Sequence, residues 1–134
     1  WGGTDVLVID MPPGTGDIQI TLSQKLDFAG AVIVSTPQDI ALIDAVKGVN
    51  MFKKVNVPIL GIVENMSYAE CPDCGKKIQV FGDSHIEEIA KEYGLPVLAR
   101  IPMNPKLAAA CDKGMIELFE GDWLQDAVSA IEAV

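Results

Sequence analysis

The chain has 134 residues, of which 49% are hydrophobic and 22% are charged, enough apolar content for one globular domain and too much for disorder. Its longest apolar runs are far shorter than the roughly 20 residues that cross a bilayer. A formal net charge of -9 argues against nucleic acid or an anionic membrane surface as a partner, because both attract clusters of lysine and arginine.

Four short runs rich in β-branched residues predict strands, and helical patterns separate them. The runs cover residues 4–10, 30–36, 58–63 and 96–101. Their apolar residues are continuous rather than alternating, which is typical of parallel strands covered on both faces. Residues 38–54 place Leu42, Val49 and Phe52 on one helical stripe. The alternation of strand and helix predicts an α/β fold with a mostly parallel, doubly wound sheet flanked by helices.

One segment, at about residues 67–82, interrupts this alternation. It contains Cys71 and Cys74 in the sequence "AECPDCGKK", and its composition predicts a small hairpin inserted after the third strand. Ser84 follows, with Glu87 three residues later, which is the pattern of a capping box at the start of a helix. The sequence therefore predicts one α/β unit that carries an inserted CxxC hairpin.

The sequence "DMPPGTGD" follows the first predicted strand. It places Asp10 at the carboxyl end of that strand, where open parallel sheets bind ligands. A carboxylate there can hold the water shell of Mg²⁺, and Gly14 would let backbone N–H groups approach a terminal phosphate. A strand that ends in a polar turn, with Asp17 as a helix N-cap, explains the same residues without a ligand. Spacing alone leaves both interpretations open.

Several motifs in a fixed order carry a more specific signal. They are "DMPPGTGD", "VSTPQDIALIDAVKG", "GIVENMS" and "CPDCG". Together they resemble the Mrp/ApbC-type iron–sulfur cluster carrier ATPases, a MinD/ParA-like branch of the P-loop NTPases, over nearly the whole chain. The resemblance implies a partial P-loop NTPase fold, ATP held at the interface of a homodimer, and a 4Fe-4S cluster that is transferred to apo iron–sulfur proteins.

The resemblance also implies roles for individual residues. Asp10 would be the Walker-B acid near Mg²⁺, and residues 11–17 would form the switch loop that senses the γ-phosphate. Asn65 matches the asparagine that contacts adenine, and the stretch Ile101-Pro102-Met103 matches the segment that lies against the base. Judged without the resemblance, Asn65 is more simply a turn residue after its strand, and Pro102 marks the entry to a helix.

The P-loop pattern GxxxxGK[ST] does not occur in the sequence. Without it, the phosphate cradle and the lysine that neutralises developing charge are missing. Members of the family carry these elements N-terminal to the Walker-B strand, so we expect residues 1–134 to be the C-terminal part of one P-loop ATPase domain. We expect the full-length protein to hydrolyse ATP and this chain alone to be inactive.

Cys71 and Cys74 form a CPxCG knuckle that directs two thiolates at one point. A 4Fe-4S cluster or a structural zinc usually takes four protein ligands, and one chain offers two. The third cysteine, Cys111, is expected to be buried and inert on an apolar helix face. Two knuckles that face each other across a twofold axis would supply four thiolates, which favours a cluster shared by a homodimer. Zinc bound by a non-enzymatic binding module is the alternative.

Two further patterns bear on the class of protein. A positioning ATPase of the cell-division type should end in a basic amphipathic helix, but "DWLQDAVSAIEAV" contains no lysine or arginine. The three cysteines suit a reducing compartment better than a disulfide scaffold, so we expect a cytoplasmic protein with no membrane or nucleic-acid partner. The only histidine, His85, is expected to be exposed to solvent at the start of a helix.

Overall fold

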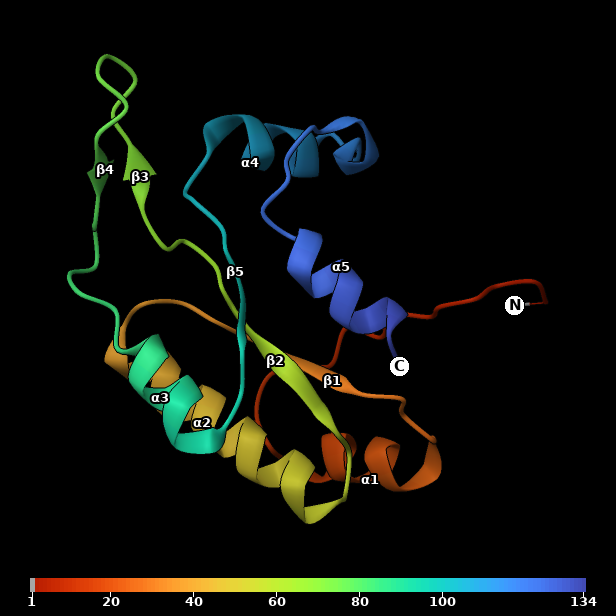
Figure 1. The fold of residues 1–134 in the computed structure, drawn as a ribbon. Helices are drawn as coiled ribbons and strands as arrows, with labels where there is room; N and C mark the ends of the chain where they lie inside the picture. Colours follow the sequence, from red (N-terminus) through yellow and green to blue (C-terminus); the bar gives the residue numbers. More distant parts are fainter. Residues whose placement is uncertain (1) are drawn as a thin grey trace.

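The computed structural model describes residues 2–134 and has a parallel three-stranded sheet at its centre (Figure 1). The strands have the order β1-β2-β5 and comprise Ala31–Ser35, Ile59–Glu64 and Val97–Arg100. Ile33 lies opposite Ile62 in the first ladder, and Val63 lies opposite Ala99 in the second. Three of the four predicted strands are confirmed, together with their parallel pairing.

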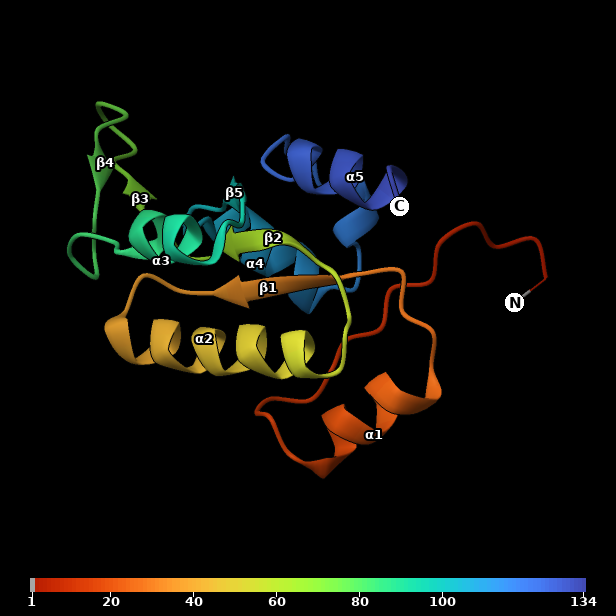
Figure 2. The ribbon, with the colours of Figure 1, turned by 60° about the horizontal axis from the view of Figure 1, so that its bottom comes forward.

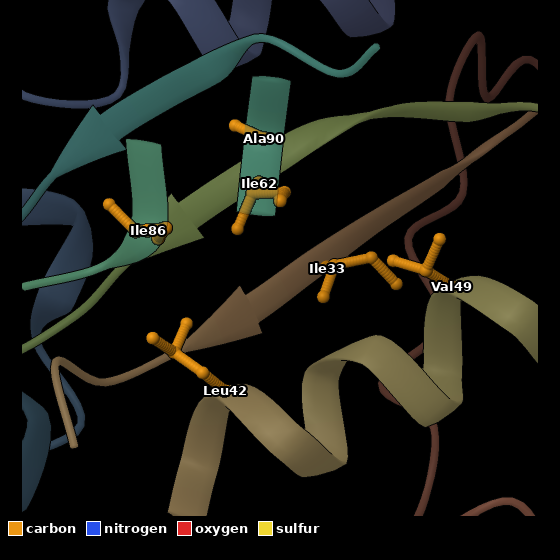
Figure 3. Close-up of a cluster of buried hydrophobic side chains, with 6 residues drawn as sticks. All are labelled: Ile33, Leu42, Val49, Ile62, Ile86 and Ala90. Atoms are coloured by element: carbon orange, nitrogen blue, oxygen red, sulfur yellow. The ribbon is translucent and has the colours of Figure 1, made fainter. Parts of the chain in front are cut away.

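The helices cover both faces of this sheet. α2 (Asp39–Lys54) follows β1, and α3 (Ile86–Tyr93) precedes β5. In the order β1-β2-β5, each strand lies on the same side of the strand before it, and parallel crossover connections are right-handed. Both helices therefore pack on the same face of the sheet (Figure 2). Figure 3 shows the resulting core, which consists of Ile33, Leu42, Val49, Ile62, Ile86 and Ala90. α5 (Gln125–Glu132) covers the opposite face, which confirms the prediction of a doubly wound arrangement.

The remaining helices lie outside these two layers. α1 (Asp17–Lys25) precedes β1, and α4 (Pro105–Asp112) and the 3₁₀ helix η1 (Ile116–Leu118) follow β5. The Asn104 side chain caps α4 by accepting hydrogen bonds from the backbone N–H groups of Lys106 and Leu107. Across residues 2–134, every helix is too short or too polar to cross a membrane.

The inserted segment forms the predicted hairpin. β3 (Ala69–Glu70) pairs antiparallel with β4 (Lys77–Ile78), and the hairpin projects from the edge of the sheet where β2 and β5 end (Figure 1). Its position after the carboxyl end of β2 matches the predicted insertion at about residues 67–82. The hairpin thus places its turn away from the hydrophobic core.

The predicted first strand, residues 4–10, is wrong for this structure. The segment joins no ladder, and its apolar side chains are exposed, with Val8 77% accessible. A parallel strand obtains its hydrogen bonds only from neighbouring strands, and among residues 2–134 no strand pairs with this segment. Asp10 is consequently exposed in an irregular segment and does not sit at the carboxyl end of a buried strand.

Gly61 offers a test of how tightly the sheet packs. A Cβ at this position would lie 2.5 Å from Leu98 Cγ and 2.8 Å from the carbonyl oxygen of Pro96. We expect Gly61→Ala to lower the free energy of unfolding by about 2 kcal/mol, measured by urea denaturation, because the backbone must shift.

Gly48 in α2 is the matched control for this substitution. A Cβ there meets only Ile33 Cδ1, at an ordinary 3.8 Å. We expect Gly48→Ala to raise the free energy of unfolding by about 0.5 kcal/mol, because alanine loses less backbone entropy than glycine in a helix. Equal effects of the two substitutions would contradict this account of the sheet.

Candidate functional site

Cys71 and Cys74 lie in the turn between β3 and β4. The backbone N–H of Gly75 donates to the carbonyl of Cys71 at 2.8 Å, and Gly75 has a φ of +69°, which favours glycine. Both thiols are free, Cys74 is exposed and Cys71 is half-buried. The turn therefore presents two accessible sulfur ligands beside each other.

The backbone of this turn favours the thiolate form of Cys71. The pKa of the Cys71 thiol is lowered because the N–H of Cys74 donates a hydrogen bond to its sulfur, with smaller contributions from the N–H of Asp73 and the side chain of Cys74. The thiolate is the form that binds metals. Within residues 2–134, no group of three or more Cys, His, Asp or Glu side chains is placed to hold a metal ion.

The base of the hairpin is hydrogen-bonded to the segment that follows β5. The N–H of Ser67 donates to the carbonyl of Ile101 at 2.9 Å, and the N–H of Met103 donates to the carbonyl of Tyr68 at 2.7 Å. A parallel bridge between Ala69 and Met103 continues this pairing. Residues 101–103, which sequence resemblance assigns to the adenine site, are therefore direct neighbours of the CxxC hairpin.

Asn65 begins the turn between β2 and this hairpin. Its N–H donates to the carbonyl of Ser35 at 2.8 Å, and its Oδ1 accepts the N–H of Met66 at 2.9 Å. Met66 has a φ of +54°, so the chain turns sharply here. The side chain is half-buried, Pro102 is buried and Met103 is half-buried. Asn65, Pro102 and Met103 thus lie together at the carboxyl edge of the sheet.

A buried carboxylate lies at the same edge, and sequence reasoning missed it. Glu64, the last residue of β2, is 1% exposed and accepts hydrogen bonds from the hydroxyls of Ser67 and Ser84. Arg100 Nε lies 3.6 Å from Glu64 Oε1. The signal in the sequence is a glutamate that ends an otherwise apolar run, "ILGIVE". A charged residue in that position requires buried partners.

The capping box predicted at Ser84 does not form. Ser84 Oγ accepts a hydrogen bond from the N–H of Ile86 at 3.2 Å, but the N-cap residue of α3 is His85, whose side chain makes no capping hydrogen bond to this helix. The Glu87 carboxylate pairs with Arg100 at 2.5 Å instead of completing a capping box. The Ser84 hydroxyl donates to the buried Glu64, so the predicted local motif gives way to tertiary contacts.

The loop of residues 11–16 lies apart from this edge. Gly14 has a φ of +96°, a conformation that favours glycine. The buried Gln19 side chain in α1 donates hydrogen bonds from Nε2 to the carbonyls of Pro12 at 2.8 Å and Pro13 at 2.9 Å. Gln19 thus holds the loop on α1, a role that its sequence context did not indicate. Asp10 and Gly14 stay outside the sheet.

Cys111 is exposed, so the prediction that it is buried is wrong. It lies on α4, which packs against η1 and buries none of its own residues. The apolar stripe that suggested burial has no sheet beneath it. Its exposure does not add a third thiol to the knuckle, because Cys111 belongs to no ligand group in residues 2–134.

His85 links the first turns of α2 and α3. Its Nδ1 lies 2.9 Å from Asp39 Oδ1, and both side chains are exposed, as expected for His85. The pair borders an apolar groove of about 410 Å³ between α2 and α3. The pKa of His85 is raised, chiefly by its hydrogen bond to Asp39 and the charge of that carboxylate, with smaller contributions from Glu88 and Asp83.

The chain is similar in sequence to known proteins. Residues 1–133 match the family described as NUBPL iron-transfer P-loop NTPase. The chain is 52% identical over 114 residues to an iron-sulfur cluster carrier protein from Aquifex aeolicus, which covers 85% of the chain and 31% of that relative. It is 51% identical over 119 residues to the mouse iron-sulfur cluster transfer protein NUBPL, covering 89% of the chain and 37% of the relative.

A solved structure is similar as well. A nucleotide-binding protein from Archaeoglobus fulgidus, in complex with ADP and with cobalt found by PIXE, superposes with a TM-score of 0.76 at 41% sequence identity. The match covers 84% of this chain and 46% of that protein. The chain thus spans about a third of the length of the two curated relatives and about half of this structural neighbour.

The His85 pair makes a prediction about pH. We expect the pKa of His85, followed by NMR titration of the only histidine, to lie above 6.5 and to fall toward that value in Asp39→Asn. Because the folded pKa is raised, the pair stabilises the fold below pH 6.5, and this contribution is lost as the pH rises through the folded pKa.

Asp44→Asn is the control for this titration, because Asp44 is also exposed on α2 but pairs with Lys47. This substitution should leave the His85 pKa unchanged. A His85 pKa that does not respond to Asp39→Asn would contradict the pairing.

Proposed function

Since the chain belongs to the NUBPL iron-transfer P-loop NTPase family, we propose that its protein is an ATP-dependent carrier that holds an iron–sulfur cluster on Cys71 and Cys74 and transfers it to apo iron–sulfur proteins. The observation that carries the proposal is the hairpin, which presents two accessible thiols and is hydrogen-bonded at its base to residues 101–103. The names of the curated relatives support cluster transfer. Free thiols fit a reducing compartment, here the cytoplasm.

The cluster is a 4Fe-4S cluster shared across a homodimer. Such clusters take four cysteine thiolates, and residues 2–134 group two at the knuckle. A twofold axis through the hairpin tips brings two knuckles together and completes the set. The thiolates of two exposed hairpin tips can move apart without unfolding of the core, so the cluster can be released to an acceptor protein.

The nucleotide is ATP with Mg²⁺, bound at the carboxyl edge of the sheet. Asn65, Pro102 and Met103 contact the adenine, and their common position at this edge supports that role. Asp10 acts as the Walker-B acid near Mg²⁺, and Gly14 acts near the γ-phosphate in the switch loop of residues 11–17. The ADP complex of the similar Archaeoglobus fulgidus protein supports a nucleotide site.

Asp10 can take that role only if its segment joins the sheet. We propose that residues 1–134 are the C-terminal part of a P-loop ATPase domain, and that a P-loop strand lies between residues 4–10 and β1. The apolar side chains that are exposed in residues 4–10 and in β1, where Val34 is 64% exposed, support the proposed strand between these two segments. Burial beside a strand would bring Asp10 to the carboxyl edge.

The cluster proposal predicts different outcomes for the cysteines. After anaerobic reconstitution of the full-length protein with iron and sulfide, we expect Cys71→Ala to abolish the cluster absorption and the Mössbauer signal. Cys111→Ala, which removes an exposed thiol on α4, should keep both. Retention of zinc alone, with no cluster absorption in the unchanged protein, would show that the chain belongs to a zinc-binding module instead.

The fold predicts that residues 1–134 do not turn over ATP by themselves. We expect no phosphate release above background in a coupled assay, because no P-loop neutralises the developing charge. We also expect strong binding of an apolar dye, because Val6, Leu7, Val8 and Ile9 are exposed. Turnover by the purified chain that is lost in Asp10→Asn, and so does not come from a contaminant, would refute the prediction.

A further inference from the structure

Glu64 occupies the junction between the sheet and the CxxC hairpin. Its side chain is 1% exposed, although it ends the strand that leads into the projecting hairpin (Figure 1). It is the only buried acidic residue among residues 2–134. A buried carboxylate is costly unless its oxygens are paired, so its partners show what its position depends on.

The two carboxylate oxygens hold opposite ends of the hairpin. Oε1 accepts a hydrogen bond from the hydroxyl of Ser67, where the chain enters the hairpin. Oε2 accepts a hydrogen bond from the hydroxyl of Ser84, where the chain leaves it and begins α3. One side chain thus ties together two segments that are 17 positions apart. The hairpin is closed at its base by Glu64, while its turn stays free.

The same carboxylate is oriented by the sheet. Arg100, the last residue of β5, lies 3.6 Å from Oε1 and is held on its other side by Glu87 of α3. The backbone carbonyl of Glu64 also accepts the N–H of Ile101 at 2.8 Å. Glu64 is therefore in contact with the hairpin base, with β5 and with the start of residues 101–103.

We propose that Glu64 is the positioning residue of the metal-binding hairpin: its carboxylate fixes the base of the hairpin against residues 101–103 and so determines where Cys71 and Cys74 hold their metal. This inference rests on the proposed function in taking the two cysteines as ligands. Glu64 itself touches neither metal nor nucleotide. Its loss loosens the hairpin relative to the sheet and leaves the ligand set intact.

The test compares the full-length protein with Ser84→Ala, which frees one end of the hairpin, and with Glu64→Gln, which removes the charge that both hydroxyls bind. Cobalt(II) alone is the metal probe, followed through its thiolate absorption while EDTA removes it. Hydrogen exchange is measured in parallel on the amides of Ser67, Cys71 and Gly75. These amides donate to Ile101, Lys76 and Cys71 in the structure.

We expect each variant to release cobalt about tenfold faster and to exchange these hairpin amides about tenfold faster, the effect of losing one hydrogen bond to a buried charge. The cobalt spectrum at saturation should stay unchanged, because both thiolates remain. Amides in the last two turns of α2, at the end away from His85, should exchange as in the unchanged protein. Ser84→Thr keeps a hydroxyl at this position and should restore both rates.

Ser129→Ala and Glu92→Gln are the matched controls, since both residues are exposed: Ser129 lies on α5, and Glu92 lies in the last turn of α3, at the end away from Ser84. They should change neither rate. Unchanged hairpin exchange in Ser84→Ala and Glu64→Gln would overturn the proposal. A rise in exchange that is equal in the hairpin and in α2 would also overturn it, because it would reflect loss of global stability.

The two proposals can fail separately. If the unchanged protein binds no cobalt, or if Cys71→Ala binds it equally well, the metal-carrier function fails. Exchange at the hairpin then decides whether Glu64 holds its base. If cobalt is bound through Cys71 but leaves the variants no faster than the unchanged protein, Glu64 has no positioning role, and the carrier function stands.

Discussion

The double pairing of β2 is the constraint on which the rest of the structure depends. β2 is hydrogen-bonded to β1 on one side and to β5 on the other, so its backbone groups are satisfied without water. The pairing continues past the end of the strand, where Asn65 donates to Ser35 and Ile101 donates to Glu64. Everything that the structure brings to the candidate site is attached to this end of β2.

This arrangement separates a rigid base from an exposed tip. At the base, two hydroxyls and a guanidinium satisfy a carboxylate that would otherwise be costly to bury. At the tip, Cys71 and Cys74 are held only by the backbone of a tight turn. A metal at the tip can therefore leave without disturbing the core, while the base determines where the tip lies.

The opposite edge of the sheet is incomplete in the described residues. The outer edge of β1 pairs with no strand, and Val34 of β1 is exposed. Residues 4–10 also pair with no strand, and four of their apolar side chains are exposed. The site at the carboxyl edge is held by contacts from several elements, whereas the loop of residues 11–16 is held by α1, through the Gln19 side chain and the Ile20 N–H that donates to the carbonyl of Gly16.

The sequence by itself determined the elements whose signal is local. β1, β2, β5 and α2 follow from continuous apolar runs and from a helical stripe, and the CxxC turn follows from its cysteine and glycine spacing. These patterns report which side chains must leave water and which backbone angles are needed, and both are set within a few residues. The position of the hairpin after β2 could be predicted for the same reason.

Only the tertiary structure decided the features that depend on distant partners. Residues 4–10 have the composition of a strand but lack neighbours to pair with, and Cys111 lies on an apolar stripe with no sheet beneath it. The partners of Glu64 come from Ser84 and Arg100, which no local pattern connects to β2. A side chain is buried, and its polar atoms find hydrogen-bond partners, only where the fold brings other segments into contact with it. Those contacts depend on the whole chain and cannot be read from a short segment.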